Sequence, residues 1–111
     1  MSDEQRPNLT IYPDGRKAEI KFVTSGMKYR PKSSEIDYGD TNEVSGRIRI
    51  NARPPIEDQA GTLLHEYLHH LCVVMNMHES AREDWVQAME FNLRSLIRLN
   101  KANFIWIINN L

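Results

Sequence analysis

Five consecutive residues, His65-Glu66-Tyr67-Leu68-His69, place two imidazoles and a carboxylate at a spacing that suits metal chemistry. On a helix, residues i and i+4 lie about 40° apart, so His65 and His69 could grip one ion. Glu66 would project from a neighbouring part of the helix surface, where it could reach a water held by the ion. In this HExxH pattern, zinc lowers the pKa of the water to about 7 and the glutamate removes its proton. The sequence predicts a zinc site on both histidines, with Glu66 as the general base.

A catalytic zinc needs a third protein ligand, which the motif does not contain. The longer HExxHxxGxxH pattern is absent, because Cys72 and Met75 stand where it has its glycine and its third histidine. A carboxylate from the following helix is the other common solution, and both Glu83 and Glu90 could face the first helix. A tight antiparallel hairpin slightly favours Glu90, while Glu83 could instead be the partner of Ser80 in a capping box. Further alternatives are Glu79, Asp84 and His78.

The motif falls within a predicted helix that begins after Pro54-Pro55, since proline is tolerated in a first helical turn. Glu57 and Asp58 suit the positive end of that helix. Apolar residues at helical spacing predict a largely buried helix that ends around 74–77: Leu64, Leu68, Leu71 and Met75. Two histidines and a glutamate on such a helix could be accidental, but they would be costly to bury without partners, which favours the metal site.

A second helix is expected to open at the possible capping box Ser80-Ala81-Arg82-Glu83. Asn100 or Asn103 is expected to interrupt it. The apolar segment 104–108 is then expected to pack as a last short helix or strand.

Before residue 54, apolar residues tend to alternate with polar ones, which is typical of strands. Leu9–Tyr12 and Ala18–Val23 flank the turn tripeptide Pro13-Asp14-Gly15 and predict a hairpin. Gly46–Asn51 alternates arginine with isoleucine and predicts a strand whose isoleucines are buried. Glu35–Tyr38 is a possible third strand. The polar stretches expected to be loops are 25–34 and 39–45.

The 111 residues and their ordinary composition predict one α+β domain over 1–111, with 1–7 disordered: a short, mostly antiparallel sheet, an active-site helix and a helical hairpin. A formal net charge of −1 gives no sign of a nucleic-acid partner. The single cysteine, Cys72, excludes an intrachain disulfide and fits a reducing compartment. We find neither a signal-peptide core nor an apolar run of about 20 residues, so we expect a cytoplasmic protein without membrane contact. The oligomeric state stays open.

Parts of the chain resemble a known group. The segment Thr62–His69, followed by Glu83–Val86 and by Leu93, Leu96 and Asn100, resembles small phage and prophage zincin-like proteins. These are distantly similar to the ImmA/IrrE metallopeptidases and, more broadly, to the gluzincins. The segment Tyr38-Gly39 and the strand 47–51 also resemble the region that precedes the motif in that group. The similarity covers roughly residues 35–103 and is specific at the HExxH helix.

The resemblance implies a zincin-like fold in which Glu83, on the next helix, is the third metal ligand. By the same analogy, the strand around Ile48 to Ile50 would present backbone groups to an extended substrate. Family membership supports the fold and the metal more than any particular substrate.

The expected function is hydrolysis of a peptide bond in a peptide or protein by zinc-activated water. Tyr38 is the preferred candidate for a hydrogen-bond donor to the oxyanion. One alternative keeps the metal and cleaves another amide. The other alternative is an interaction protein of zincin fold that binds a partner through its cleft or its apolar tail, without catalysis.

Overall fold

The computed structural model describes residues 6–42 and 44–111, and its mixture of strands and helices confirms the α+β class expected from the sequence. The elements run in the order β1 (Leu9–Ile11), β2 (Lys17–Val23), β3 (Tyr29–Arg30), the 3-10 turn η2 (Pro31–Ser33), β4 (Glu35–Ile36), β5 (Gly39–Thr41), β6 (Ile48–Asn51), α1 (Ile56–Val74), α2 (Glu79–Leu99) and α3 (Lys101–Asn110). The chain divides into two compact units, one up to Glu66 and one from Tyr67 to Leu111, and the boundary falls inside α1. We call them the sheet unit and the helical unit.

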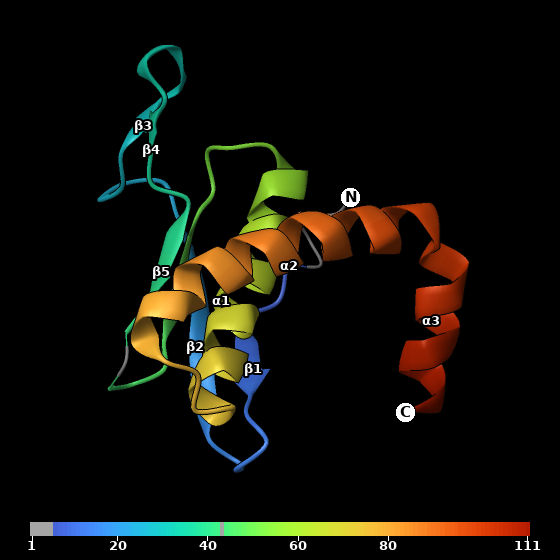
Figure 1. Ribbon diagram of the computed structural model, residues 1–111. Helices are drawn as coiled ribbons and strands as arrows, with labels where there is room; N and C mark the ends of the chain where they lie inside the picture. Colours follow the sequence, from blue (N-terminus) through green and yellow to red (C-terminus); the bar gives the residue numbers. More distant parts are fainter. Residues whose placement is uncertain (1–5, 43) are drawn as a thin grey trace. The chain divides into compact units, whose positions relative to one another are not determined.

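The sheet unit is built on a four-stranded sheet with the order β1-β2-β6-β5 (Figure 1). β1 pairs with β2 and β5 pairs with β6 in antiparallel fashion, whereas β2 and β6 are parallel. The sheet is therefore mixed and mostly antiparallel. The hairpin predicted around Pro13-Asp14-Gly15 is confirmed: Gly15 has φ +89° and donates its N–H to the carbonyl of Tyr12 at 2.9 Å.

The alternating strand β6 forms the centre of this sheet. Ile48 and Ile50 are 1% and 0% exposed, as predicted, while Arg47 and Arg49 face solvent. Because β6 pairs with β2 on one side and β5 on the other, its backbone is already bonded. The expectation that the strand around Ile48 to Ile50 would receive a substrate strand is therefore wrong. The strand at this edge of the sheet is β5.

Two segments expected to be loops contain strands. Tyr29–Arg30 forms a two-stranded hairpin with Glu35–Ile36, and this hairpin projects from the four-stranded sheet (Figure 1). Glu35–Ile36 itself confirms the strand predicted within Glu35–Tyr38. Gly39–Thr41 pairs with β6. Strands of two or three residues are too short to show a period of two in the sequence. Such segments become strands because they pair with neighbouring strands.

In the sheet unit, α1 begins directly after Pro55, as predicted. The side-chain amide of Gln59 donates to the carbonyls of Ala52 and Pro54 at 3.0 and 2.8 Å, which ties the first turn of α1 to the end of β6.

Of residues 1–7, expected to be disordered, 1–5 lie outside the described part of the chain. Arg6 donates to the amide oxygen of Gln59 at 2.9 Å and lies 4.9 Å from the ring centroid of Phe22.

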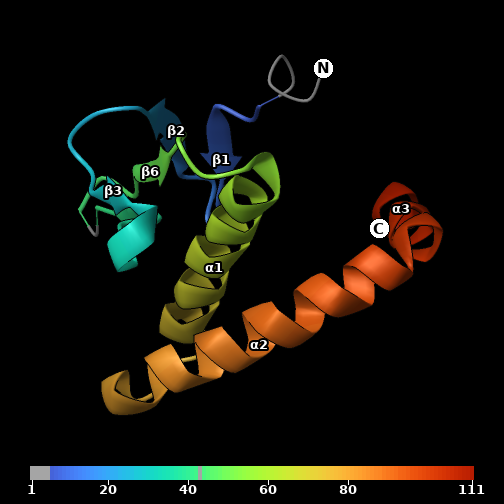
Figure 2. The ribbon, with the colours of Figure 1, turned by 90° about the horizontal axis from the view of Figure 1, so that it is seen from above.

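The helical unit contains the end of α1 followed by α2 and α3 (Figure 2). Its most buried side chains are Leu68, Cys72 and Val86, at 3%, 0% and 0% exposed. The predicted apolar stripe of α1 is thus only partly buried, because Leu71 and Met75 are 43% and 52% exposed. Spacing alone identified the helix but not which of its faces is covered.

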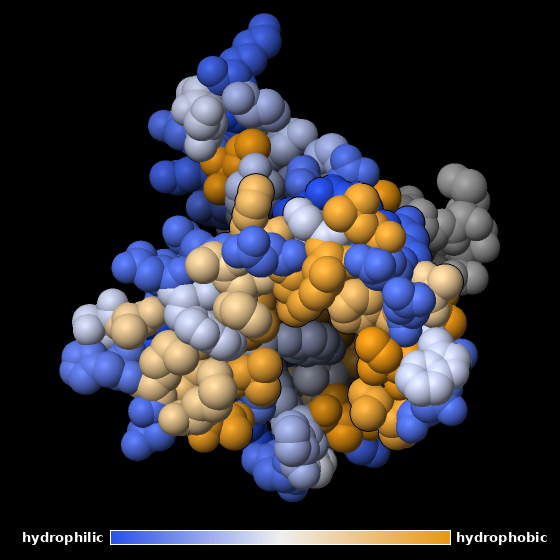
Figure 3. Space-filling view, turned by 45° about the vertical axis from the view of Figure 1, so that its right-hand side comes forward, coloured by the Kyte–Doolittle hydropathy of each residue, from blue (hydrophilic) through white to orange (hydrophobic). Residues whose placement is uncertain are grey.

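Asn100 interrupts the helices as predicted, because it caps α2 and precedes α3. The segment 104–108 is helical, but the expectation that it packs is wrong for most of its side chains. Ile105, Trp106 and Ile108 are 58%, 67% and 68% exposed. Large apolar areas are visible on the molecular surface in Figure 3. Among the described residues, no helix combines the length and the apolar character needed to cross a membrane.

Candidate metal centre

Helix α1 carries both histidines of the HExxH motif. It is continuous from Ile56 to Val74, so His65 and His69 lie one turn apart on it. Both residues are half-buried, and the ring of His69 is 33% exposed. Both rings are therefore partly shielded from solvent.

Glu83 comes from the first turns of α2. Its Oε2 atom lies 3.0 Å from Nε2 of His69, and its Oε1 atom accepts a hydrogen bond from the side-chain amide of Gln87 at 3.2 Å. His78 caps the helix, with its Nδ1 accepting the N–H of Ser80 at 3.2 Å. The capping box expected between Ser80 and Glu83 is therefore wrong, and the Glu83 carboxylate is directed to His69 instead.

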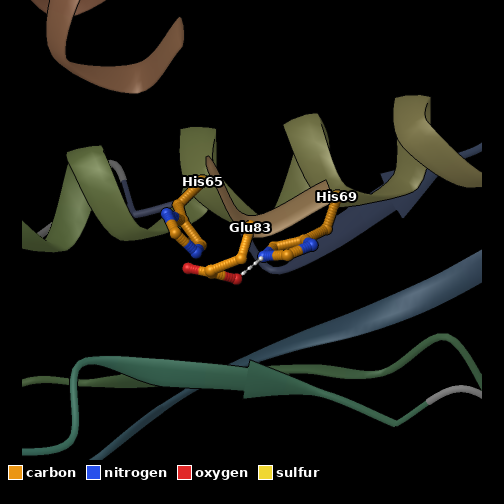
Figure 4. A group of neighbouring side chains, drawn as sticks. All are labelled: His65, His69 and Glu83. Atoms are coloured by element: carbon orange, nitrogen blue, oxygen red, sulfur yellow. Dashed lines mark ion pairs between the residues drawn. The ribbon is translucent and has the colours of Figure 1, made fainter. Parts of the chain in front are cut away.

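The structure brings His65, His69 and Glu83 together, with one ligand atom from each lying within 4.8 Å of the others. Figure 4 shows the carboxylate of Glu83 between the two imidazoles. Two imidazole nitrogens and one carboxylate oxygen form the donor set of known catalytic zinc sites, which leave a fourth position open. The three residues thus fit a metal ion by number, type and spacing, and this group could hold one.

Glu66 lies outside this group and is directed to the sheet. Its Oε1 atom accepts a hydrogen bond from the hydroxyl of Thr41, on β5, at 2.5 Å. The interaction lies wholly within the sheet unit and is partly buried. Adjacent positions on a helix differ by about 100°, which explains why Glu66 is separated from the three metal-binding candidates.

The other expected candidates lie elsewhere. Glu90 pairs with Nη1 of Arg94 at 3.2 Å, one turn further along α2. Glu79, Asp84 and His78 are not members of the group that could hold a metal ion among the described residues. Tyr38, expected as the oxyanion donor, directly precedes β5 with its side chain 45% exposed.

Cys72 lies on α1 one turn beyond His69 and is fully buried. Burial raises the pKa of its thiol, because desolvation disfavours the thiolate. Cys72 is not a member of the group that could hold a metal ion among the described residues.

Sequence reasoning missed β5 and the residues that hold it. A Cβ atom added at Gly39 would lie 2.6 Å from the Arg49 carbonyl oxygen and 2.6 Å from Cγ2 of Thr62 on α1. Gly39 therefore lets β5 approach both β6 and α1. The next residue, Asp40, pairs with both Nε and Nη2 of Arg49, and this hydrogen bond raises the pKa of the guanidinium. Gly39 belongs to the segment Tyr38-Gly39, whose resemblance to the region that precedes an HExxH motif was the only signal in the sequence for β5.

Comparison of the chain with protein-family models, with curated proteins and with solved structures finds no match. What can be inferred about function therefore comes from the residues of the site and their geometry.

Proposed function

We propose that this protein is a zinc-dependent hydrolase of the HExxH, zincin-like type that cleaves peptide bonds. His65, His69 and Glu83 would hold the zinc ion, and Glu66 would be the general base. The observation that carries the proposal is the convergence of two helical histidines and a glutamate from the next helix, with ligand atoms within 4.8 Å of one another. Glu66 directly follows His65 in the chain and lies outside the ligand set, and the HExxH mechanism assigns the role of general base to this position.

The proposed mechanism assigns a separate role to each residue. When bound, a zinc ion would supply a Lewis acid that polarises a water molecule and the substrate carbonyl. Glu66 would take one proton from the attacking water and deliver it to the leaving nitrogen as the C–N bond breaks. The second proton of the water, left on the new carboxyl group, would also pass to the nitrogen, so the products are a carboxylate and an ammonium group, and atoms and charges balance. His69 and Glu83, which would be two of the ligands, lie 3.0 Å apart.

A peptide is the substrate class that best suits the sheet unit. β5 lies at the edge of the four-stranded sheet, so the side of its backbone that faces away from β6 is available to an extended chain. Thr41, the last residue of β5, contacts Glu66. A strand added along β5 would consequently run close to the proposed base.

Metal binding is tested with a matched pair of charge-neutralising substitutions on α2, Glu83→Gln and Glu90→Gln. We expect the wild type to bind about one zinc per chain, measured by mass spectrometry of the native protein and by chelator competition. Glu83→Gln should weaken zinc binding by more than the roughly 10–100-fold that loss of an outer-shell partner costs. Glu90→Gln should leave it unchanged. Equal effects of the two would contradict the assignment, and a wild type that binds no zinc would remove the metal altogether.

Catalysis is tested with Glu66→Gln, which keeps the shape of the side chain but removes its basicity. We expect this variant to bind zinc as the wild type does and to lose hydrolysis by a factor of about 10²–10⁴. The assay is cleavage of a library of proteome-derived peptides, with new N-termini identified by mass spectrometry. A zinc-loaded wild type that cleaves no peptide would instead favour the interaction protein, which Glu66→Gln would leave fully able to bind its partner.

A further inference from the structure

Beyond the ligands and the base, one contact of the sheet unit bears on the geometry of catalysis. The Thr41 hydroxyl donates to Oε1 of Glu66 across 25 positions of sequence, at 2.5 Å. Hydrogen bonds from a hydroxyl to an ionised carboxylate are typically 2.5–2.7 Å long and about twice as strong as neutral ones. The distance between Thr41 and Glu66 falls in this range, and the contact engages one of the two carboxylate oxygens.

Thr41 is itself held in place by contacts that do not involve Glu66. It pairs with Ile48 in the register of β5 and β6, and Ile48 is 1% exposed. The preceding residue Asp40 is bound through both carboxylate oxygens to Arg49. Gly39 lies against the backbone of β6 and against Thr62 of α1. Since a β-branched side chain also has few χ1 rotamers, the hydroxyl of Thr41 is presented from a nearly rigid support.

The segment that leads into β5 is fixed as well. The side-chain amide of Asn51 donates to the carbonyl of Asp37 at 2.9 Å and to that of Lys28 at 3.3 Å. Its backbone N–H donates to the carbonyl of Tyr38 at 2.8 Å. Asn51 is 1% exposed, so these bonds are shielded from competing water. The backbone that leads to Thr41 is therefore held by these bonds from Asn51, in addition to the pairing of β5 with β6.

A glutamate side chain has three rotatable bonds, and an unrestrained carboxylate would occupy many orientations. General-base catalysis needs one oxygen of that carboxylate directed at the water, within about 2.6–3.2 Å. We propose that Thr41 is a positioning residue for Glu66: by binding Oε1, it leaves Oε2 as the oxygen that accepts the proton. This inference rests on the proposed function and adds the residue that orients its base.

The first test asks whether the contact exists, and it needs no activity. In the zinc-free protein, thermal unfolding is measured for Thr41→Val, Glu66→Met and the double variant. A shared hydrogen bond predicts that each single change lowers Tm by about 4–8 °C. The double variant should then fall by little more than the larger single change, because the bond is lost only once. Strictly additive losses would overturn the proposal.

The second test asks whether the contact positions the base. Thr41→Val keeps the shape of the side chain and removes the hydroxyl, whereas Thr41→Ser keeps the hydroxyl. On the library peptide that the zinc-loaded wild type cleaves fastest, we expect Thr41→Val to lower kcat about 10–100-fold, with KM and zinc affinity changed less than about threefold. Thr41→Ser should restore kcat to within about threefold of the wild type.

The outcomes separate this inference from the function on which it rests. If the wild type is active and Thr41→Val is equally active, Thr41 has no positioning role although the hydrolase stands. If Thr41→Ser is as impaired as Thr41→Val, the methyl group rather than the hydroxyl is needed, and the inference is wrong. If the zinc-loaded wild type is inactive, the proposed function fails, and the positioning role fails with it whatever the unfolding experiment shows.

Discussion

The sheet unit and the helical unit differ sharply in how they bury their apolar side chains. In the sheet unit, Ile20, Ile48 and Ile50 are at most 4% exposed. In the described part of the helical unit, the large apolar residues are mostly at the surface, as illustrated by Phe91 at 73% and Leu99 at 81% exposed. The sheet unit therefore holds most of the molecule's core, and the helical unit depends on a few buried contacts.

This difference corresponds to different demands on the proposed site. Glu66 must be oriented within tenths of an ångström, and it belongs to the sheet unit, where the hydroxyl of Thr41 bonds to its carboxylate. Glu83 belongs to the helical unit, where its carboxylate contacts His69 directly. A metal ligand needs less support from its surroundings than a base does, because the ion itself fixes the ligand's position once bound.

The largest expected effect comes from removing the same number of carbons in each unit. Ile50→Ala, at a fully buried position of β6, should lower the free energy of unfolding by about 2–5 kcal/mol. Leu99→Ala, at the exposed end of α2, should change it by no more than about 0.5 kcal/mol. Urea unfolding followed by circular dichroism measures both. Similar losses would mean that the surface around Leu99 is covered in solution, and the contrast between the units would disappear.

A smaller effect is expected at the contact between β5, β6 and α1. Gly39→Ala would place a Cβ atom 2.6 Å from a backbone oxygen, which cannot move without displacing a strand. We expect a loss of about 1–3 kcal/mol of unfolding free energy, measured by the same urea titration. Thr62→Ser, added to Gly39→Ala, removes one of the two obstructing groups and should recover only part of the loss. A neutral Gly39→Ala would show that β5 is less closely packed than the sheet unit as a whole.

The smallest effect is expected at the surface of the sheet unit. Asp40 and Arg49 form a doubly bonded pair, but their side chains are 50% and 45% exposed. Asp40→Asn should cost about 0.2–1 kcal/mol, because solvent screens exposed pairs. The difference between the variant and the wild type should shrink in 1 M salt, where the screening length is about 3 Å. A salt-independent loss above 2 kcal/mol would show that β5 depends on this pair rather than on Gly39.

The features visible in the sequence are those that depend on near neighbours in the chain. His65 and His69 are four positions apart, and the helical repeat places such residues on one side of α1. Pro54-Pro55 indicated where α1 begins. The alternation in β6 was equally informative, since one face of the strand had to be buried. These signals are local, so the sequence alone predicted the HExxH helix and the order of the main strands and helices of the chain.

Other features depend on residues that are distant in the chain. Neither the parallel pairing of β2 with β6 nor the edge position of β5 leaves a signal within the strand itself, because pairing joins residues that are far apart in the chain. Spacing on α2 left Glu83 and Glu90 open, and the folded chain brought Glu83 to His69 of α1, whereas Glu90 pairs with Arg94 of its own helix. The bond between Thr41 and Glu66 links positions 25 residues apart. Such contacts arise when separate elements pack together, and packing responds to the shape and volume of the whole fold rather than to any one segment.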